Sequence, residues 1–248
     1  MTELAIIGGT GLTSLKNLDI TKREVVHTPF GEPSGPLTHG VLSGKEVVFL
    51  ARHGYGHTIP PHMINYRANL WALPRTGVKK VIAVAAVGGL ADDLPSGVLA
   101  IPDQIIDYTE SRENTFFADG LSHVTHIDFT EPYCEELRQL LIRACAATKQ
   151  DFVPRGVYGA TQGPRLETAA EIERMARDGC TMVGMTGMPE AALARELELC
   201  YATCAVVVNK AAGRGVGPIS MHDIEQTVNQ GMDKVRILLE QVVPLLGT

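Results

Sequence analysis

Short apolar runs alternate along this chain with longer stretches whose apolar residues recur at helical spacing. The apolar runs, typical of strands covered on both faces of a sheet, lie at residues 4–7, 45–51, 81–86 and 201–208. The stretches with helical spacing lie at residues 131–147, 168–177, 189–198 and 220–245. This alternation predicts an α/β fold in which helices pack on a sheet.

One segment, residues 109–130, breaks the pattern. It is polar, with an aromatic pair at Phe116 and Phe117 and histidines at 123 and 126. A loop this long inside a compact domain is usually functional or part of an interface. No linker, repeat or low-complexity tract interrupts the chain, so we expect residues 1–248 to form a single domain.

Composition and charge narrow the class of protein. The chain is 45% hydrophobic and 20% charged, as in ordinary globular proteins, and its net charge of −6 with scattered basic residues argues against a nucleic-acid-binding face. The first residues lack the features of a signal peptide, and no apolar run is long enough to cross a bilayer. We therefore expect a cytoplasmic protein with neither nucleic acid nor membrane as partner.

The cysteines fit that location. There are five, an odd number, and no two have C-x-x-C spacing. This usage predicts reduced thiols. Cys200 and Cys204 lie in a run that reads as a buried strand, so we expect them to serve packing rather than chemistry.

Three groups of small or anion-binding residues lie at the ends of predicted strands. Gly8-Gly9-Thr10-Gly11 follows the first run, Arg52-His53-Gly54 follows the second, and residues 85–89 (AAVGG) end the third. Taken singly, these are equally a tight turn or a surface ion pair. Together they place phosphate donors in the crevice where open α/β sheets bind ligands.

Two further segments lead into predicted helices. Residues 161–168 combine a rigid turn with Glu167, and residues 183–190 place Thr186 between a strand and a helix. A first-turn acid and a helix cap are the ordinary interpretations. A threonine at such a position is also a good anion ligand.

In this order and over nearly the whole chain, the motifs resemble those of the methylthioadenosine phosphorylase and purine nucleoside phosphorylase family. The matching motifs are Ile7-Gly8-Gly9-Thr10-Gly11-Leu12, Arg52-His53-Gly54, Gln162-Gly163-Pro164-Arg165, Met185-Thr186 and Pro189-Glu190. The resemblance implies the nucleoside phosphorylase fold, a mixed twisted sheet flanked by helices. It also implies a pentosyltransferase that uses inorganic phosphate as co-substrate, without a cofactor or metal.

Carried over by position, the resemblance implies a phosphate site drawn from several motifs. Its members are Thr10, Arg52, His53, Ala85, Ala86 and Thr186, the two alanines through their main chain. His53 would donate a hydrogen bond to phosphate, and Met185 and Leu166 would contact the nucleoside. Phosphate held there would stabilise an oxocarbenium-like sugar and attack it at short range.

The base site departs from the adenine-specific members of the family. They carry an aspartate where this chain has Asn209, and a second aspartate where it has Ala211. An asparagine amide can donate to a 6-oxo group and accept a proton shared with N7, while ionised Glu167 accepts the N1 proton that adenine lacks. Such a mismatch discriminates by about 10⁴-fold. We expect Asn209 and Glu167 to be catalytic and to select hypoxanthine-type bases, against the plainer interpretation of a turn cap and a solvated acid.

Which residue contacts the 5′ end of the sugar depends on the register of the last predicted helix, where a shift of one residue changes the answer. Spacing from Pro218-Ile219-Ser220 favours Met221 over His222 at the pocket, and a thioether pocket suits methionine. His126 resembles a histidine that the family contributes from a neighbouring subunit, which implies a homotrimer. The implied reaction converts S-methyl-5′-thioinosine and phosphate to hypoxanthine and S-methyl-5-thioribose 1-phosphate, a step of purine salvage.

Other functions stay open at this point. His222 facing the sugar would favour a general 6-oxopurine nucleoside phosphorylase acting on inosine and guanosine. A methylthioadenosine phosphorylase conflicts with Asn209, and a nucleosidase using water leaves the phosphate ligands unexplained. Outside enzymes, the chain could be a nucleoside-binding regulatory protein.

Overall fold

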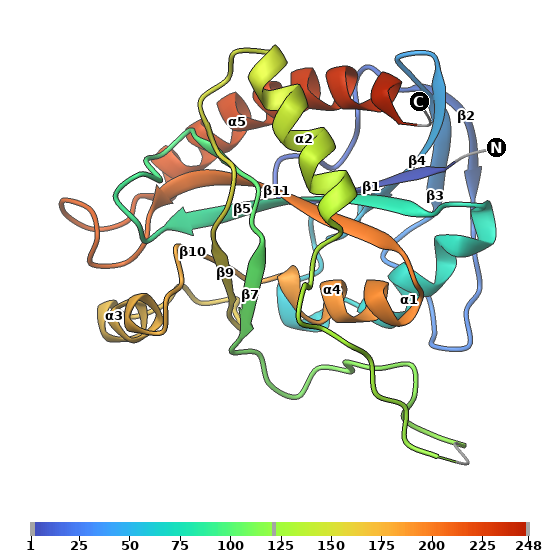
Figure 1. Cartoon of the computed structure of the whole chain (residues 1–248), viewed down its shortest axis with the longest axis horizontal. Helices are drawn as coiled ribbons and strands as arrows, with labels where there is room; N and C mark the ends of the chain where they lie inside the picture. The colour runs from blue at the N-terminus through green and yellow to red at the C-terminus, as the bar shows by residue number, and fades with distance from the viewer. Residues whose placement is uncertain (1–2, 121–122, 247–248) are drawn as a thin grey trace.

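One mixed sheet of eleven strands forms the centre of the computed structural model, which describes residues 3–120 and 123–246 (Figure 1). The strands are β1 (Leu4–Gly8), β2 (Asp19–Glu24), β3 (Leu37–Leu42), β4 (Lys45–Ala51), β5 (Lys80–Gly89), β6 (Leu99–Ala100), β7 (Gln104–Asp107), β8 (Phe152–Val153), β9 (Val157–Ala160), β10 (Met182–Gly184) and β11 (Cys200–Lys210). The helices are α1 (Tyr66–Ala72), α2 (Glu135–Ala147), α3 (Ala169–Arg177), α4 (Gly187–Glu196) and α5 (Met221–Val242), with 3-10 turns at Pro61–Met63, Pro74–Thr76 and Val243–Leu245.

Four parallel strands, in the order β4, β1, β5 and β11, make up the core of this sheet. All four were expected from the apolar runs, and the predicted mixed sheet is confirmed: its order is β2-β3-β4-β1-β5-β10-β9-β7, with β11, β6 and β8 branching from β5. Parallel strands end at one edge. The residues that follow β1, β4 and β11 are therefore neighbours in space.

The continuous apolar runs are explained by helices on both faces of the sheet (Figure 1). Leu4 and Ile6 of β1 face a core shared with α2 and α5. The alternate residues Ala5 and Ile7 face a second core shared with α1 and α4. Because successive side chains of a strand point to opposite faces, a strand covered on both sides must be apolar throughout.

The predicted helices form with two adjustments. The stretch at 131–147 becomes helical only at Glu135, because the Cys134 N–H donates to the Tyr201 carbonyl at 2.8 Å and holds the chain extended. In α4, Met188 is extended (φ −120°, ψ 139°), so regular helix starts at Pro189 as expected. Ser220 caps α5 through its hydroxyl, also as expected.

The third apolar run continues further than predicted. Residues 85–89 do not follow the strand but lie within β5, where Gly88 and Gly89 pair antiparallel with Val183 and Met182 of β10. A Cβ at Gly89 would lie 2.3 Å from the Leu94 carbonyl oxygen, so only glycine fits there. Ala85 and Ala86 remain near the carboxyl end of the parallel core.

The expectation that all five cysteines are reduced is wrong. Cys134, just before α2, forms a disulfide with Cys200 at the start of β11, and Cys145, Cys180 and Cys204 are free and buried. The two partners are 66 residues apart, so spacing in the sequence does not reveal the pair. The hydrogen bond from the Cys134 N–H to the Tyr201 carbonyl holds the segment before α2 beside the start of β11 and so brings the two cysteines together.

Reducing this disulfide should lower the free energy of unfolding by about 4 kcal/mol, because closing a loop of 66 residues restricts the unfolded chain. Denaturant unfolding with and without dithiothreitol measures the difference. Cys134→Ser is the matched variant, and reductant should have no further effect on it. Equal unfolding midpoints for the oxidised and reduced parent protein would contradict this stabilisation.

The segment 109–130 contains neither helix nor strand in its described part, 109–120 and 123–130 (Figure 1). Within the described chain, we find no helix with the length and apolar character needed to span a membrane.

Candidate active site

A cleft of about 310 Å³ opens at the carboxyl ends of the parallel strands. It gathers twelve residues that the sequence singled out from seven separate segments. These are Thr10, Arg52, His53, Ala85, Ala86, Leu166, Glu167, Met185, Thr186, Asn209, Ala211 and Met221. These segments meet because each of them lies at the end of a strand or helix that reaches this edge of the sheet, or directly follows one.

The glycines after β1 bring the chain unusually close to its neighbours. A Cβ at Gly9 would lie 2.5 Å from the Val84 carbonyl oxygen and 3.0 Å from Arg52 Nη1. The tight approach places Thr10 at the wall of the cleft, beside the Arg52 guanidinium. Glycine is thus needed here for packing as well as for the turn.

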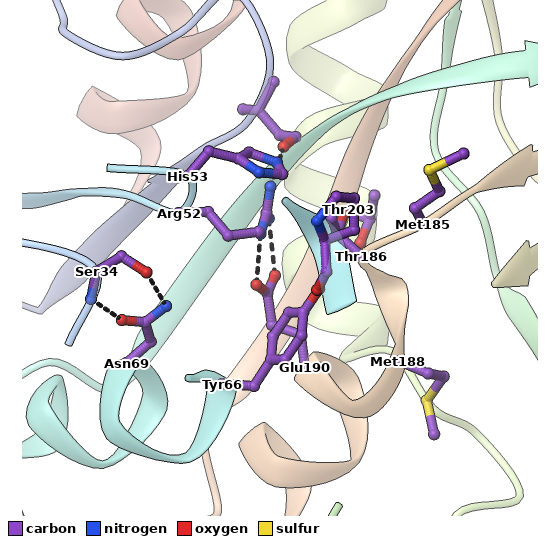
Figure 2. A network of polar contacts seen from close by, with 12 residues as sticks. Ser34, Arg52, His53, Tyr66, Asn69, Met185, Thr186, Met188, Glu190 and Thr203 are labelled. Carbon is purple, nitrogen blue, oxygen red and sulfur yellow. Dashed lines mark hydrogen bonds and ion pairs between the residues drawn. The ribbon is translucent and has the colours of Figure 1, made fainter. Parts of the chain in front are cut away.

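Arg52 is buried and paired, not part of a surface ion pair. Its side chain is 1% exposed; Nε donates to Glu190 Oε2 at 2.6 Å and Nη2 to Oε1 at 2.8 Å (Figure 2). Nη1 donates to the Val84 carbonyl at 2.9 Å. Glu190, on α4, is fully buried and also accepts from the Tyr201 hydroxyl at 2.8 Å. In the sequence, Glu190 is recognisable only as part of the Pro189-Glu190 motif, and its pairing with Arg52 was not predicted.

The Glu190 carboxylate keeps the Arg52 guanidinium protonated at the wall of the cleft, although the pair as a whole carries no net charge. Burial opposes the charge of Arg52, but the Glu190 carboxylate outweighs that effect and raises the pKa of the guanidinium. Of its five N–H groups, three are used in the bonds to Glu190 and Val84. The two that remain belong to Nη1 and Nη2 and can serve an anion in the cleft.

His53 is held in one tautomer, and its role differs from the expected one. Nδ1 lies 2.8 Å from the Ile59 carbonyl oxygen, so Nδ1 carries the proton and donates it. Burial, together with the charge of Arg52, lowers the pKa of His53 to about 4. The ring is therefore neutral near pH 7 and offers Nε2 as an acceptor, whereas the sequence predicted a donor.

Thr186 directly precedes α4, yet its side chain makes no capping hydrogen bond. Thr168, by contrast, caps α3 in a full capping box with Glu171. Thr186 is only 7% exposed and lines the cleft. The cap interpretation therefore fails for Thr186, whose N–H donates to the buried Tyr158 hydroxyl at 3.4 Å.

Glu167 reaches the cleft from the segment between β9 and α3. Its Oε1 accepts from the Thr161 hydroxyl at 2.6 Å, which fixes the carboxylate. The interpretation of a freely solvated acid is wrong, since Glu167 is half-buried. Leu166 beside it is 41% exposed at the cleft wall.

A β-bulge aims Asn209 into the cleft. The register between β11 and β5 shifts between Val207 and Asn209, so Val208 is an extra residue in the ladder. Asn209 Nδ2 donates to the Lys210 carbonyl at 2.6 Å, which orients the amide. Ala211 follows at the wall, and its methyl cannot form the contacts of a carboxylate.

The start of α5 forms the apolar end of the cleft. Met221, Ile224 and Val228 line it at helical spacing, together with Ile219, whereas His222 is absent from the described lining residues. Met221 is 67% exposed, so this end is open to solvent. Helical periodicity from Met221 could have identified Ile224 and Val228, which the sequence reasoning missed.

His126 is the one expected site residue outside the cleft. It is exposed in the segment 109–130 of this single chain. Its contribution from a neighbouring subunit remains a prediction.

In the described residues, one cluster has metal-ligating groups within reach of one another: Cys134, Glu136 and Cys200. Its two sulfurs form the disulfide, and none of the three residues lines the cleft. The cleft itself offers hydrogen-bond donors and acceptors for a small anionic and polar ligand.

The model of the phosphorylase superfamily matches residues 3–244 of this sequence. The chain belongs to that superfamily. Among curated relatives, the probable S-methyl-5′-thioinosine phosphorylase of Pseudomonas syringae pv. tomato is 55% identical over 98% of this chain and 99% of its own length. The 6-oxopurine nucleoside phosphorylase of Pyrococcus furiosus is 45% identical over 99% of this chain and 94% of its own.

Solved structures agree with this phosphorylase assignment. Methylthioadenosine phosphorylase from Schistosoma mansoni, in complex with adenine, superposes with a TM-score of 0.95 at 32% identity and covers 100% of this chain and 92% of that one. The family and the nucleoside phosphorylase fold predicted from the motifs are confirmed. The chain is accordingly a pentosyltransferase of the purine nucleoside phosphorylase type.

Proposed function

We propose that this phosphorylase acts on S-methyl-5′-thioinosine, releasing hypoxanthine and S-methyl-5-thioribose 1-phosphate with inorganic phosphate as its co-substrate. The observation that carries the proposal is that Asn209, Glu167 and Met221 all line the same cleft. Relatives named as probable S-methyl-5′-thioinosine phosphorylases, up to 55% identical over nearly the full length, support it.

At the phosphate end, Arg52, Thr186 and Thr10 would supply the donors. His53 would accept through Nε2, which suits a phosphate that still carries one proton. Because Arg52 is fixed by Glu190, its remaining N–H groups need no reorganisation when phosphate binds. Phosphate held in this way stabilises the developing positive charge on the sugar and attacks it in line.

At the base end, Asn209 would assist departure of the purine. Its amide can donate to O6 while its carbonyl oxygen accepts the proton shared with N7. Glu167, held by Thr161, would accept the N1–H of a 6-oxopurine. The same carboxylate would face the N1 lone pair of adenine, a repulsive arrangement that favours hypoxanthine as product.

At the sugar end, Met221, Ile219 and Ile224 provide an apolar surface for a methylthio group. Because this end is open, we further propose a homotrimer in which His126 of a neighbouring copy completes it. A cytoplasmic location and a place in purine salvage belong to the same proposal.

A general 6-oxopurine nucleoside phosphorylase is the second candidate. The openness of the cleft beside Met221, 67% exposed, favours it, because water could there solvate a 5′-hydroxyl. This activity keeps the roles of Asn209 and Glu167 and changes only the sugar end. Relatives named as 6-oxopurine phosphorylases are 43–46% identical to this chain.

The test is kcat/KM for methylthioinosine, inosine and methylthioadenosine, each with and without phosphate. We expect phosphate-dependent turnover led by methylthioinosine. Asn209→Asp should shift the preference toward methylthioadenosine, because a carboxylate accepts from a 6-amino group and repels a 6-oxo group. Ala212→Ser, a conservative change at the cleft wall, serves as the control for general perturbation.

Any other order of kcat/KM among the three nucleosides would identify a specific error in the proposal. Equal turnover of inosine would assign the second candidate. A lead for methylthioadenosine, or an Asn209→Asp variant with unchanged base preference, would overturn the base assignment. Turnover without phosphate would overturn phosphorolysis itself.

A further inference from the structure

We propose that Arg112 is a positioning residue that locks together the two segments carrying base and ribose recognition. The inference rests on the proposed function for its kinetic consequences, but its structural part does not depend on the substrate. Arg112 lies in the segment 109–130, outside the cleft and outside every motif that identified the family.

All three nitrogens of the Arg112 guanidinium donate to the two segments. On one side, Nε donates to the Gln162 side chain at 3.0 Å, and Nη2 donates to the carbonyls of Thr161 at 3.2 Å and Gln162 at 2.7 Å. On the other side, Nη1 donates to the carbonyls of Met185 at 2.9 Å and Met188 at 2.6 Å. A planar fork that bridges two loops in this way is beyond the geometry of lysine.

The bridged segments hold functional groups on adjacent walls of the cleft. Thr161 fixes the carboxylate of Glu167, and Thr186 lies between the two carbonyls that Arg112 binds on the second segment. The segments also touch directly: Thr161 N–H donates to the Gly184 carbonyl at 2.8 Å, and a Cβ on Gly163 would lie 2.5 Å from Met185 Sδ. Figure 2 shows Met185, Thr186 and Met188 along the second segment.

Arg112 is itself held from the opposite side. Its guanidinium carbon lies 5.4 Å from the centre of the Tyr66 ring, on α1, and Nη1 is 3.3 Å from the Tyr66 hydroxyl. Just before it, Ser111 takes a left-handed conformation (φ 56°). Such strained positions persist where surrounding contacts determine them.

The residues after Arg112 are anchored to the helices beneath. Glu113 pairs with Arg67 of α1 at 2.8 Å. The Thr115 hydroxyl and the Phe116 N–H donate to the two oxygens of Glu196, on α4, at 2.6 and 2.7 Å. Residues 113–116 are therefore held in place by α1 and α4, which fixes the position of the neighbouring guanidinium.

It follows that the distance between Glu167 and Thr186 is set by Arg112 and not only by the sheet. A displacement of about 1 Å between such groups costs on the order of 100-fold in rate. Loss of the guanidinium should loosen both segments together, lower turnover and weaken base discrimination, while the phosphate ligands on β1 and β4 keep their places.

The experiment compares Arg112→Ala, Arg112→Lys and the control Arg174→Ala by hydrogen–deuterium exchange and kinetics. Arg174 also lies over a tyrosine ring, 5.6 Å from the centre of Tyr108, but has no role in the cleft. We expect faster exchange at residues 161–167 and 185–188 in Arg112→Ala, with β1 unchanged. kcat/KM for methylthioinosine should fall about 100-fold, and its ratio to that for methylthioadenosine should fall too.

Millimolar methylguanidinium should partly restore both exchange protection and kcat in Arg112→Ala, and Arg112→Lys should stay impaired although folded. Unchanged exchange in both segments, or a general loss of melting temperature without rescue, would overturn the proposal. If the parent protein does not turn over methylthioinosine, the proposed function fails, and the exchange arm still decides whether Arg112 holds the two segments.

Discussion

Glu190→Leu should destabilise the protein by about 3–5 kcal/mol, because it leaves the buried Arg52 guanidinium without its counter-charge. Both side chains are almost completely inaccessible, at 0% and 1% exposure. Denaturant unfolding followed by circular dichroism measures the loss. The exposed pair of Arg165 and Glu171 is the matched control, and Arg165→Ala should leave the unfolding midpoint nearly unchanged.

A double variant separates stability from chemistry. Arg52→Met combined with Glu190→Leu removes both charges and should recover much of the stability, since apolar side chains can replace a buried pair. The double variant should nevertheless show no phosphate-dependent turnover, because the guanidinium that would bind phosphate is gone. If Glu190→Leu alone proved as stable as the parent, the buried pair would not contribute to the free energy of unfolding.

The second large effect is expected at Glu167. Glu167→Gln should lower kcat/KM for methylthioinosine by about 10- to 150-fold, corresponding to a hydrogen bond to a charged group of roughly 1.5–3 kcal/mol. Relative activity on methylthioadenosine should rise, because the carboxylate no longer faces the N1 lone pair. Parallel kinetics on the two nucleosides measure the change in preference.

Glu171→Gln is the control for Glu167→Gln. Glu171 lies on α3 four residues away, belongs to a capping box and does not line the cleft. It should leave base preference unchanged. A Glu167→Gln variant with the same ratio of the two activities as the parent would show that the carboxylate does not read the base.

The sequence alone predicted the parallel core and the position of the cleft. A strand covered on both faces must be apolar throughout, so β1, β4, β5 and β11 could each be identified as an uninterrupted run. Residues at the carboxyl ends of parallel strands must converge, so Thr10, Arg52 and Ala86 could be grouped from the sequence, whereas Asn209 was identified only through the family resemblance. The register of α5 followed from its cap at Ser220.

The ends of the helices and strands were less predictable. The stretch at 131–134 has helical spacing but stays extended, because Cys134 bonds to Tyr201 and to Cys200. Residues 85–89 were placed after a strand and lie within it, because β10 offers Gly88 and Gly89 a pairing partner. In both cases a contact made elsewhere in the chain outweighs the local pattern.

The sequence by itself thus determined the four core strands and helices α2 to α5, because burial and capping leave a periodic trace in consecutive residues, and its ordered motifs determined the family. The tertiary structure decided which polar groups satisfy one another. Arg52 meets Glu190 across 138 residues, and Arg112 reaches Met185 across 73. Such pairings depend on strand order and loop direction. A guanidinium has the same appearance in a sequence whether it binds phosphate, a buried carboxylate or the carbonyls of two loops.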